Sequence, residues 1–152
     1  MTEAAITFVV EEVAWRGHRG LLSKLTRAAV AAAKAAKLPA KSRFTILLAD
    51  NARLKLLNKD FRGKNKPTNV LSFPSAERGY AGDIALAYGV TQAEAMKAKK
   101  KFADHAAHLV VHGVLHLAGY DHMTERDAGV MEPLETKILA RLGVPDPYEV
   151  QA

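Results

Sequence analysis

The sequence predicts an α+β domain in which a small mixed β-sheet of about four strands is packed with helices. Four short runs of aliphatic and β-branched residues lie in the first 87 residues, whereas the remainder shows helical periodicity. Strict alternation of strands and helices, typical of repeated βαβ units, is absent. With 152 residues and 49% hydrophobic content, the chain has an ordinary size for one core. We therefore expect a single domain over residues 1–152.

Each predicted strand is a run of aliphatic and β-branched residues. The four runs are Ile6 to Val10, Arg43 to Asp50, Val70 to Phe73 and Asp83 to Ala87. A polar loop around Gly79 joins the last two. The strands come early in the chain and the C-terminal half is helical, which favours the α+β class.

Leucines and alanines that recur at helical spacing predict a first helix, which starts at Leu21 and is closed by Pro39. We interpret this alanine-rich segment as a packing helix. A short second helix is predicted from Asn51 to Asn58. The chain then enters a basic loop over residues 61–67, where a glycine and a proline interrupt regular structure.

Three further helices are predicted after the last strand. One begins at Thr91 and runs through Lys101, and the next carries the histidines over residues 109–117. Thr124, with Asp127 three residues later, resembles a capping arrangement that opens the last helix. One face of that helix is expected to carry four apolar side chains: Val130, Leu134, Ile138 and Leu142.

The histidine helix and the turn after it carry the pattern most informative about function. In a helix over residues 109–117, His112 and His116 lie one turn apart on the same face. Gly119 can adopt the left-handed conformation that ends a helix, so the chain folds back and brings His122 toward the same point. We therefore predict that His112, His116 and His122 bind one metal ion and leave room for a water.

Zinc is the predicted metal, because neutral imidazole suits it and three protein ligands with one open position is the pattern of catalytic zinc sites. The spacing matches part of the metzincin signature, but Gly113 stands where those proteases carry the glutamate that serves as general base. Two histidines four residues apart are by themselves typical of a half-buried helix face. The third histidine and Gly119 favour the metal site.

Three neighbouring residues are expected to support this site rather than to form it. His105 and His108 extend the histidine cluster upstream, and we assign them a supporting or structural role. A ligand histidine normally donates its second ring N–H to a carboxylate or a carbonyl. Asp121 or a backbone group is a candidate acceptor, and the alternative for Asp121 is a turn residue before His122.

The sequence excludes several classes of function. The absence of cysteine removes disulfides, thiolate ligands and cysteine nucleophiles, and leaves histidine and carboxylate as metal ligands. Phosphate-loop, dinucleotide-binding and serine-hydrolase motifs are missing, so no nucleotide cofactor is expected. The apolar run from Ile6 to Val10 is too short for a signal sequence or a membrane span. We expect a soluble cytoplasmic protein with no membrane partner.

Charge is distributed unevenly along the chain. Residues 1–66 contain 14 lysines and arginines against 5 acidic residues, whereas residues 102–152 contain 3 against 8. The formal net charge is +6. A basic N-terminal half suggests a polyanionic partner, although long lysines that merely solvate helix faces give the same count. Together with the metal site, the charge favours a nucleic acid, without distinguishing RNA from DNA.

Two long motifs resemble those of the bacterial YbeY endoribonucleases. The first reads L-N-x-x-F-R-G-K-N-x-P-T-N-V-L-S-F-P over residues 57–74 and is followed by G-D-I at 82–84. The second reads H-G-x-L-H-L-x-G-Y-D-H over residues 112–122. The match spans roughly residues 43 to 142 in the order that the family uses, and no motif position departs from its pattern.

This resemblance implies a zincin-like α+β fold and a zinc-dependent, single-strand-specific endoribonuclease. The implied role is maturation of the 3′ end of 16S ribosomal RNA and late ribosome quality control, with ribosomal RNA, the ribosome or ribosomal proteins as partners. His112, His116 and His122 are the implied ligands of one zinc ion per chain. Arg62 is the implied catalytic residue beside the metal, and its alternative is an ordinary residue of a basic loop.

The implied chemistry agrees with the residue types. Zinc lowers the pKa of bound water to about 7, so a glutamate base is less necessary. An arginine can stabilise charge on a phosphate. Two other functions share these features. One is a non-catalytic ribosome-assembly or RNA-binding factor with a structural metal. The other is a zinc metallopeptidase, which requires a carboxylate near the water.

Overall fold

The computed structural model describes residues 5–39, 41–120 and 125–149. Its four strands are β1 (Ala5–Val10), β2 (Arg43–Ala49), β3 (Val70–Pro74) and β4 (Tyr80–Ala87). They form one sheet in the order β1-β2-β4-β3, in which β1, β2 and β4 are parallel and β3 is antiparallel to β4. The predicted mixed sheet and α+β class are confirmed.

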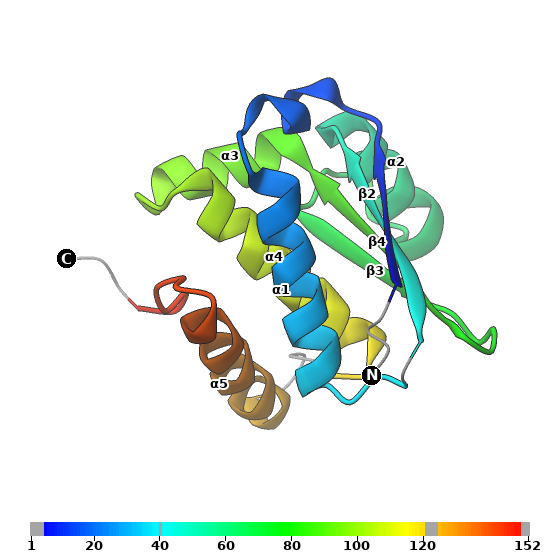
Figure 1. The fold of residues 1–152 in the computed structure, drawn as a ribbon. Coiled ribbons are helices and arrows are strands. Elements are labelled where there is room, and N and C mark those ends of the chain that lie inside the picture. Colours follow the sequence, from blue (N-terminus) through cyan, green and yellow to red (C-terminus); the bar gives the residue numbers. More distant parts are fainter. Residues whose placement is uncertain (1–4, 40, 121–124, 150–152) are drawn as a thin grey trace.

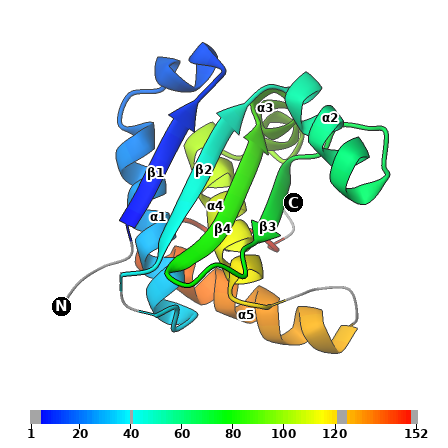
Figure 2. The same ribbon diagram turned by 90° about the vertical axis from the view of Figure 1, so that its right-hand side faces the viewer.

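Helices lie on both sides of this sheet (Figures 1 and 2). The described helices are the 3-10 helix η1 (Val13–Gly17), α1 (Leu21–Ala35), α2 (Asn51–Arg62), α3 (Tyr88–Lys97), α4 (Phe102–Leu117) and α5 (Glu125–Arg141). α1 and α4 form the main core together with one face of the sheet. α5 packs against α1 and α4. α2 covers part of the opposite face. Among the described residues, no helix has the length and apolar character needed to cross a membrane.

Alternation along β2 explains why α4 lies where it does. Phe44, Ile46 and Leu48 point to one face and are fully buried in the main core. On the same face α4 contributes Val110, Val111, Val114 and Leu115, which are also inaccessible to solvent. α4 is thus held by apolar contacts along most of its length, and these contacts fix the direction of its histidine side chains.

α2 is one turn longer than the sequence predicted. The short helix expected to end at Asn58 continues through Arg62, and Gly63 ends it in the left-handed region with φ 69°. Phe61 and Arg62 therefore belong to a helix and not to the predicted basic loop. The residues after Asn58 are mostly polar, so their helical conformation has little apolar periodicity to reveal it.

α3 and α5 also differ from the predictions. α3 ends at Lys97, not at Lys101, because the chain turns at Lys99, which has φ 56°, to begin α4. On α5, Val130 is 57% exposed, whereas Ile138, which was predicted to share its face, is buried. The fully or largely buried side chains of α5 are Met131, Glu135, Ile138 and Leu139. Thr124, the predicted cap, lies outside the described residues.

Candidate functional site

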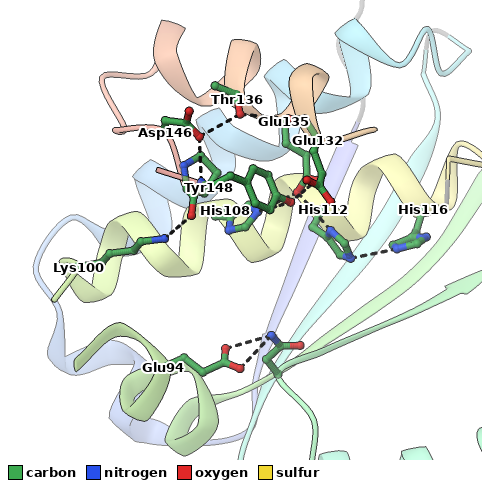
Figure 3. Close-up of polar contacts among 12 residues, drawn as sticks. Glu94, Lys100, His108, His112, His116, Glu132, Glu135, Thr136, Asp146 and Tyr148 are labelled. Atoms are coloured by element: carbon green, nitrogen blue, oxygen red, sulfur yellow. Dashed lines mark hydrogen bonds and ion pairs between the residues drawn. The ribbon is translucent and has the colours of Figure 1, made fainter. Parts of the chain in front are cut away.

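α4 brings two of the three predicted metal ligands together. His112 and His116 are one helical turn apart, and their Nε2 atoms lie 3.0 Å from each other (Figure 3). Two nitrogens that share a tetrahedral zinc ion at its usual bond length would be separated by roughly 3.3 Å. The observed contact has the length of a hydrogen bond, and one metal ion bound by both atoms would need only a slightly larger spacing. His122, the third predicted ligand, and Asp121 lie outside the described residues.

Gly119 ends α4 as the sequence predicted. It has φ 99°, its N–H donates to the carbonyl of His116, and the N–H of Tyr120 donates to the carbonyl of Leu115. These two hydrogen bonds form the Schellman arrangement, in which a left-handed residue satisfies the last carbonyls of a helix. The chain is turned back immediately after His116, close to the two imidazoles.

A buried carboxylate on α5 accepts hydrogen bonds from two histidines of α4. Glu135 is 0% exposed and accepts hydrogen bonds from His112 Nδ1 at 3.2 Å, His108 Nε2 at 2.8 Å and the Tyr148 hydroxyl at 2.6 Å (Figure 3). Burial by itself raises the pKa of Glu135, but these three hydrogen bonds outweigh it and lower the pKa to about 2. Burial and the contact with Glu135 raise the pKa of Tyr148 above its usual value. Glu135 is therefore ionised and acts only as an acceptor.

The acceptor role of Glu135 determines which nitrogen of His112 is available. Since His112 donates from Nδ1, the neutral imidazole carries its lone pair on Nε2, the atom that faces His116. The sequence suggested Asp121 or a backbone group as this partner and did not identify Glu135. It did contain a hint, because Glu135 occupies the same face of α5 as Met131 and Ile138.

His112 also belongs to a second group of possible ligands. One nitrogen each of His108 and His112 and one oxygen of Glu135 lie within 4.8 Å of one another, close enough to hold a metal ion. The contacts from both histidines to Glu135 have the lengths of hydrogen bonds. His108, assigned a supporting role from the sequence, is thus connected to His112 through Glu135.

His105 is held by a separate network. Its Nε2 lies 2.9 Å from Glu94 on α3, and the side-chain amide of Asn69 donates to the same carboxylate at 3.0 Å. Burial lowers the pKa of His105, while the contact with Glu94 opposes that effect. This network links α3 and α4 to the residue that precedes β3.

Gly113 lies where α4 comes closest to the sheet. A Cβ atom at this position would be 2.8 Å from Ile84 Cγ2 on β4, nearer than real Cβ contacts come. The Ser72 hydroxyl on β3 donates to the carbonyl of Gly113 at 3.0 Å and holds the helix against the sheet. A larger side chain fits there only if Ile84 or the strand that carries it shifts. This packing explains why the glutamate of zinc proteases has no counterpart at this position.

The histidine pair opens into a basic groove of about 340 Å³. Residues from α2, from the loop that follows it, from β3 and from α4 line this groove: Asn58, Arg62, Lys64, Lys66, Thr68, Asn69, Val70, Leu71, Ser72, His112 and His116. Arg62, the predicted catalytic residue, is therefore on the same groove as two predicted ligands. The described lining residues include three cations and no carboxylate, so the groove suits an anion.

Asn58 shapes the basic wall of this groove. Asn58 is 2% exposed, and its side-chain amide donates to the backbone carbonyl of Lys66 at 2.9 Å. The backbone carbonyl of Asn58 accepts the N–H of Lys64. The loop after α2 is thereby folded back along the helix, with its lysines exposed beside Arg62. The sequence does not reveal this role, because a polar residue in a helix gives no indication of its buried partners.

Comparisons with known proteins agree on one family. The sequence model described as "Endoribonuclease YbeY" matches residues 13–143. A protein of that name from Methylocella silvestris is 45% identical over 150 residues, which cover 95% of this chain and 85% of the relative. Another from Rhizobium etli is 42% identical over 165 residues, with 99% and 96% covered. The solution structure of TM1509 from Thermotoga maritima matches with a TM-score of 0.63 at 25% identity, over 95% of this chain and 99% of that one.

Proposed function

The chain belongs to the endoribonuclease YbeY family, and on this premise we propose that it cleaves single-stranded ribosomal RNA with the help of one zinc ion. Family membership itself makes the protein a metal-dependent endoribonuclease, a hydrolase of RNA phosphodiester bonds. The proposal adds the identity of the ion and a role in maturing the 3′ end of 16S ribosomal RNA and in late ribosome quality control. Its proposed setting is the cytoplasm, with the ribosome or ribosomal proteins as partners.

One observation carries the proposal: two converging imidazoles and an arginine line the same basic groove. The imidazoles suit a divalent metal, and the arginine with its neighbouring lysines suits phosphates. A peptide substrate would give no reason for three cations beside the metal ligands. The packing at Gly113 also argues against a metallopeptidase, because it leaves no space for the carboxylate base.

His112, His116 and His122 would hold the zinc ion. The Nε2 atoms of the first two would need only a slightly larger spacing to share a metal, and Glu135 keeps the Nε2 of His112 unprotonated through the contact at Nδ1. When bound, zinc supplies Lewis acidity and a coordinated water whose pKa is about 7. The groove offers no carboxylate base among its described lining residues, which agrees with a nucleophile that needs none.

Arg62 would bind the phosphate at which cleavage occurs. Its guanidinium is planar, always charged and able to donate two parallel hydrogen bonds to phosphate oxygens. It lies in the last turn of α2, so its backbone is fixed, while its side chain is exposed and free to meet the substrate. Charge that develops on the phosphate during cleavage is stabilised by such a preorganised donor.

The test is elemental analysis of the purified protein combined with an RNA cleavage assay before and after chelation. We expect about one zinc per chain, cleavage of a single-stranded RNA that includes the 3′ region of 16S ribosomal RNA, loss of cleavage on chelation and recovery on adding zinc. Folded apoprotein is verified by circular dichroism. If metal removal unfolds the chain and the loaded protein never cleaves RNA, the metal is structural and the protein is a non-catalytic assembly factor. The termini of the products further distinguish attack by water from attack by the ribose 2′-hydroxyl.

A further inference from the structure

An exposed aromatic side chain stands next to Arg62 at the end of α2. Phe61 is 67% exposed, although its ring has a partner in Phe73 of β3, with ring centroids 5.2 Å apart and planes inclined by 60°. Both residues line a groove on the face of the sheet where α2 packs. α2 covers that face only in part (Figure 2). Exposed apolar surface of this kind, beside a charged groove, is typical of a binding site.

The aromatic pair lies at one end of an apolar groove of about 850 Å³. The groove runs over the sheet between β1, β2, β3, β4 and the end of α2, and its lining is Val9, Thr45, Leu47, Leu57, Phe61, Arg62, Ser72, Phe73, Pro74, Asp83, Ile84 and Ala85. Arg62 and Ser72 line both this groove and the basic groove. The carboxylate of Asp83 accepts a hydrogen bond from Tyr80, which partly satisfies the single acidic group of the lining.

We propose that this apolar groove is a nucleobase subsite, in which an unpaired base of the RNA stacks on Phe61 while the adjoining phosphate is bound by Arg62. The inference rests on the proposed function and extends it to the choice of substrate. Two features favour RNA over a protein partner here: the groove is continuous with the cationic wall through Arg62, and that wall complements phosphates.

Stacking on Phe61 gives a physical reason for a single-strand preference. A base in a duplex has both faces covered by its neighbours, whereas an unpaired base offers a face to an aromatic ring at no loss of pairing. Every base has such a face, so the contact would tolerate different sequences. The phosphate contacts of the basic groove are available to both single-stranded and duplex RNA, so charge does not distinguish them. Stacking in the subsite would favour the single strand.

The test compares variants of Phe61 with a control on the same helix. Phe61→Ala and Phe61→Leu remove the ring, Phe61→Tyr retains it, and Leu56→Ala removes apolar surface that is 48% exposed but does not line the groove. The probe is a single-stranded oligoribonucleotide that contains 2-aminopurine, with a duplex of the same sequence for comparison. We expect Phe61→Ala and Phe61→Leu to weaken single-strand binding by about 5- to 150-fold and to abolish fluorescence quenching, while Phe61→Tyr and Leu56→Ala retain both.

Zinc content and the urea midpoint of each variant establish that the fold and the metal site are intact. If Phe61→Ala binds single-stranded RNA as the wild type does, or if it weakens duplex binding equally, the subsite is absent and the proposed function stands. If Phe61→Leu behaves as the wild type, the contact is apolar and not a stacking interaction, and the inference fails. A wild-type protein that cleaves no RNA overturns the proposed function itself.

Discussion

The two walls of the basic groove differ in how firmly they are fixed. On the α4 wall, His112 is held by a carboxylate that is fully buried and is itself held by His108 and Tyr148. On the α2 wall, Arg62 and the lysines after it are exposed, and only the backbone is secured, by Asn58. In the proposed function, the α4 wall would therefore be ordered before a metal ion binds, whereas the exposed side chains of the α2 wall would become ordered when they bind RNA. The proposed metal chemistry, which needs a fixed geometry, is thus assigned to the α4 wall. The proposed binding of phosphates, which needs mobile side chains, is assigned to the α2 wall.

The largest expected effect comes from removing a ligand of the α4 wall. Under the proposed function, His112→Ala, His116→Ala and His122→Ala should each lose stoichiometric zinc and reduce single-turnover cleavage by more than about a thousandfold, because the ion that these residues would hold would supply both Lewis acidity and an activated water. His105→Ala is the matched control, since this histidine lies on the same helix but contacts Glu94. Elemental analysis and cleavage rates check the result. Undiminished zinc in all three ligand variants would refute the assignment. Loss of zinc in His112→Ala alone would point instead to the group formed by His108, His112 and Glu135.

Arg62 tests whether the exposed wall contributes to chemistry or only to attraction. Lysine keeps the charge but loses the planar fork, so Arg62→Lys should slow cleavage nearly as much as Arg62→Ala, by about a hundredfold to a thousandfold. Zinc content should not change in either variant. Arg53, on the same helix but bound to Glu11, provides the control: Arg53→Lys should cleave normally. Near-normal single-turnover rates for Arg62→Lys would reduce Arg62 to a positioning charge.

Glu135 tests whether the support behind the α4 wall matters for metal binding. Glu135→Ala removes the acceptor for His112 Nδ1, and loss of such a partner typically weakens metal affinity by about 10- to 100-fold. Glu135→Gln keeps an acceptor oxygen, so its metal affinity should lie between those of the wild type and Glu135→Ala. Glu132→Ala, one turn earlier on α5, is the control. Competition with a chelator measures the affinity, and the nitrogen chemical shifts of His112 report whether the proton leaves Nδ1. Unchanged affinity and tautomer in Glu135→Ala would contradict the role inferred from the geometry.

Gly113 tests how tightly α4 is held against the sheet. In an open helical position, replacing glycine by alanine stabilises a protein by about 0.5 to 1 kcal/mol. At Gly113 the new Cβ would meet Ile84, so Gly113→Ala should instead lower the free energy of unfolding by about 1 to 3 kcal/mol. At Gly129 on α5, an added Cβ atom would have nothing within 4 Å, and Gly129→Ala is the control with the opposite sign. Urea denaturation measures both, and a stabilised Gly113→Ala protein would show that the sheet yields.

Features that depend on local structure could be predicted from the sequence, whereas features that depend on tertiary packing could not. The spacing of His112 and His116 and the turn at Gly119 depend on residues within one helix and its end, and both predictions hold. Glu135 supports the site across the interface of α4 and α5, and no local pattern specifies which residue of α5 faces His112. Glu135 can be recognised in the sequence as a charged residue on an otherwise apolar face only when the buried face of α5 is assigned correctly.

Arg62 illustrates the other limit of local patterns. Its motif is recognisable in the sequence, but the predicted structure there was a loop because residues 59–62 have little apolar periodicity. Their helical conformation depends on the packing of α2 over the sheet and on the hydrogen bonds between Asn58 and the following loop. Motif identity was thus accessible before structure, whereas the shape of the groove that joins Arg62 to the histidines required the tertiary fold.

The smallest expected effect concerns the lysines of the exposed wall, which should act through charge alone. If Arg62, Lys64 and Lys66 each neutralise one phosphate of a single strand, log affinity should fall with log salt with a slope of about −2, since each contact contributes about 0.7. Lys64→Ala should make the slope shallower by about 0.7 and leave the rate of cleavage of bound RNA unchanged. Lys137→Ala, on α5 and outside the groove lining, should leave the slope as it is. Equilibrium binding at several salt concentrations measures the slope. A slope that Lys64→Ala does not alter would mean that the RNA follows another path across the protein, and the exposed wall would then lose its assigned role.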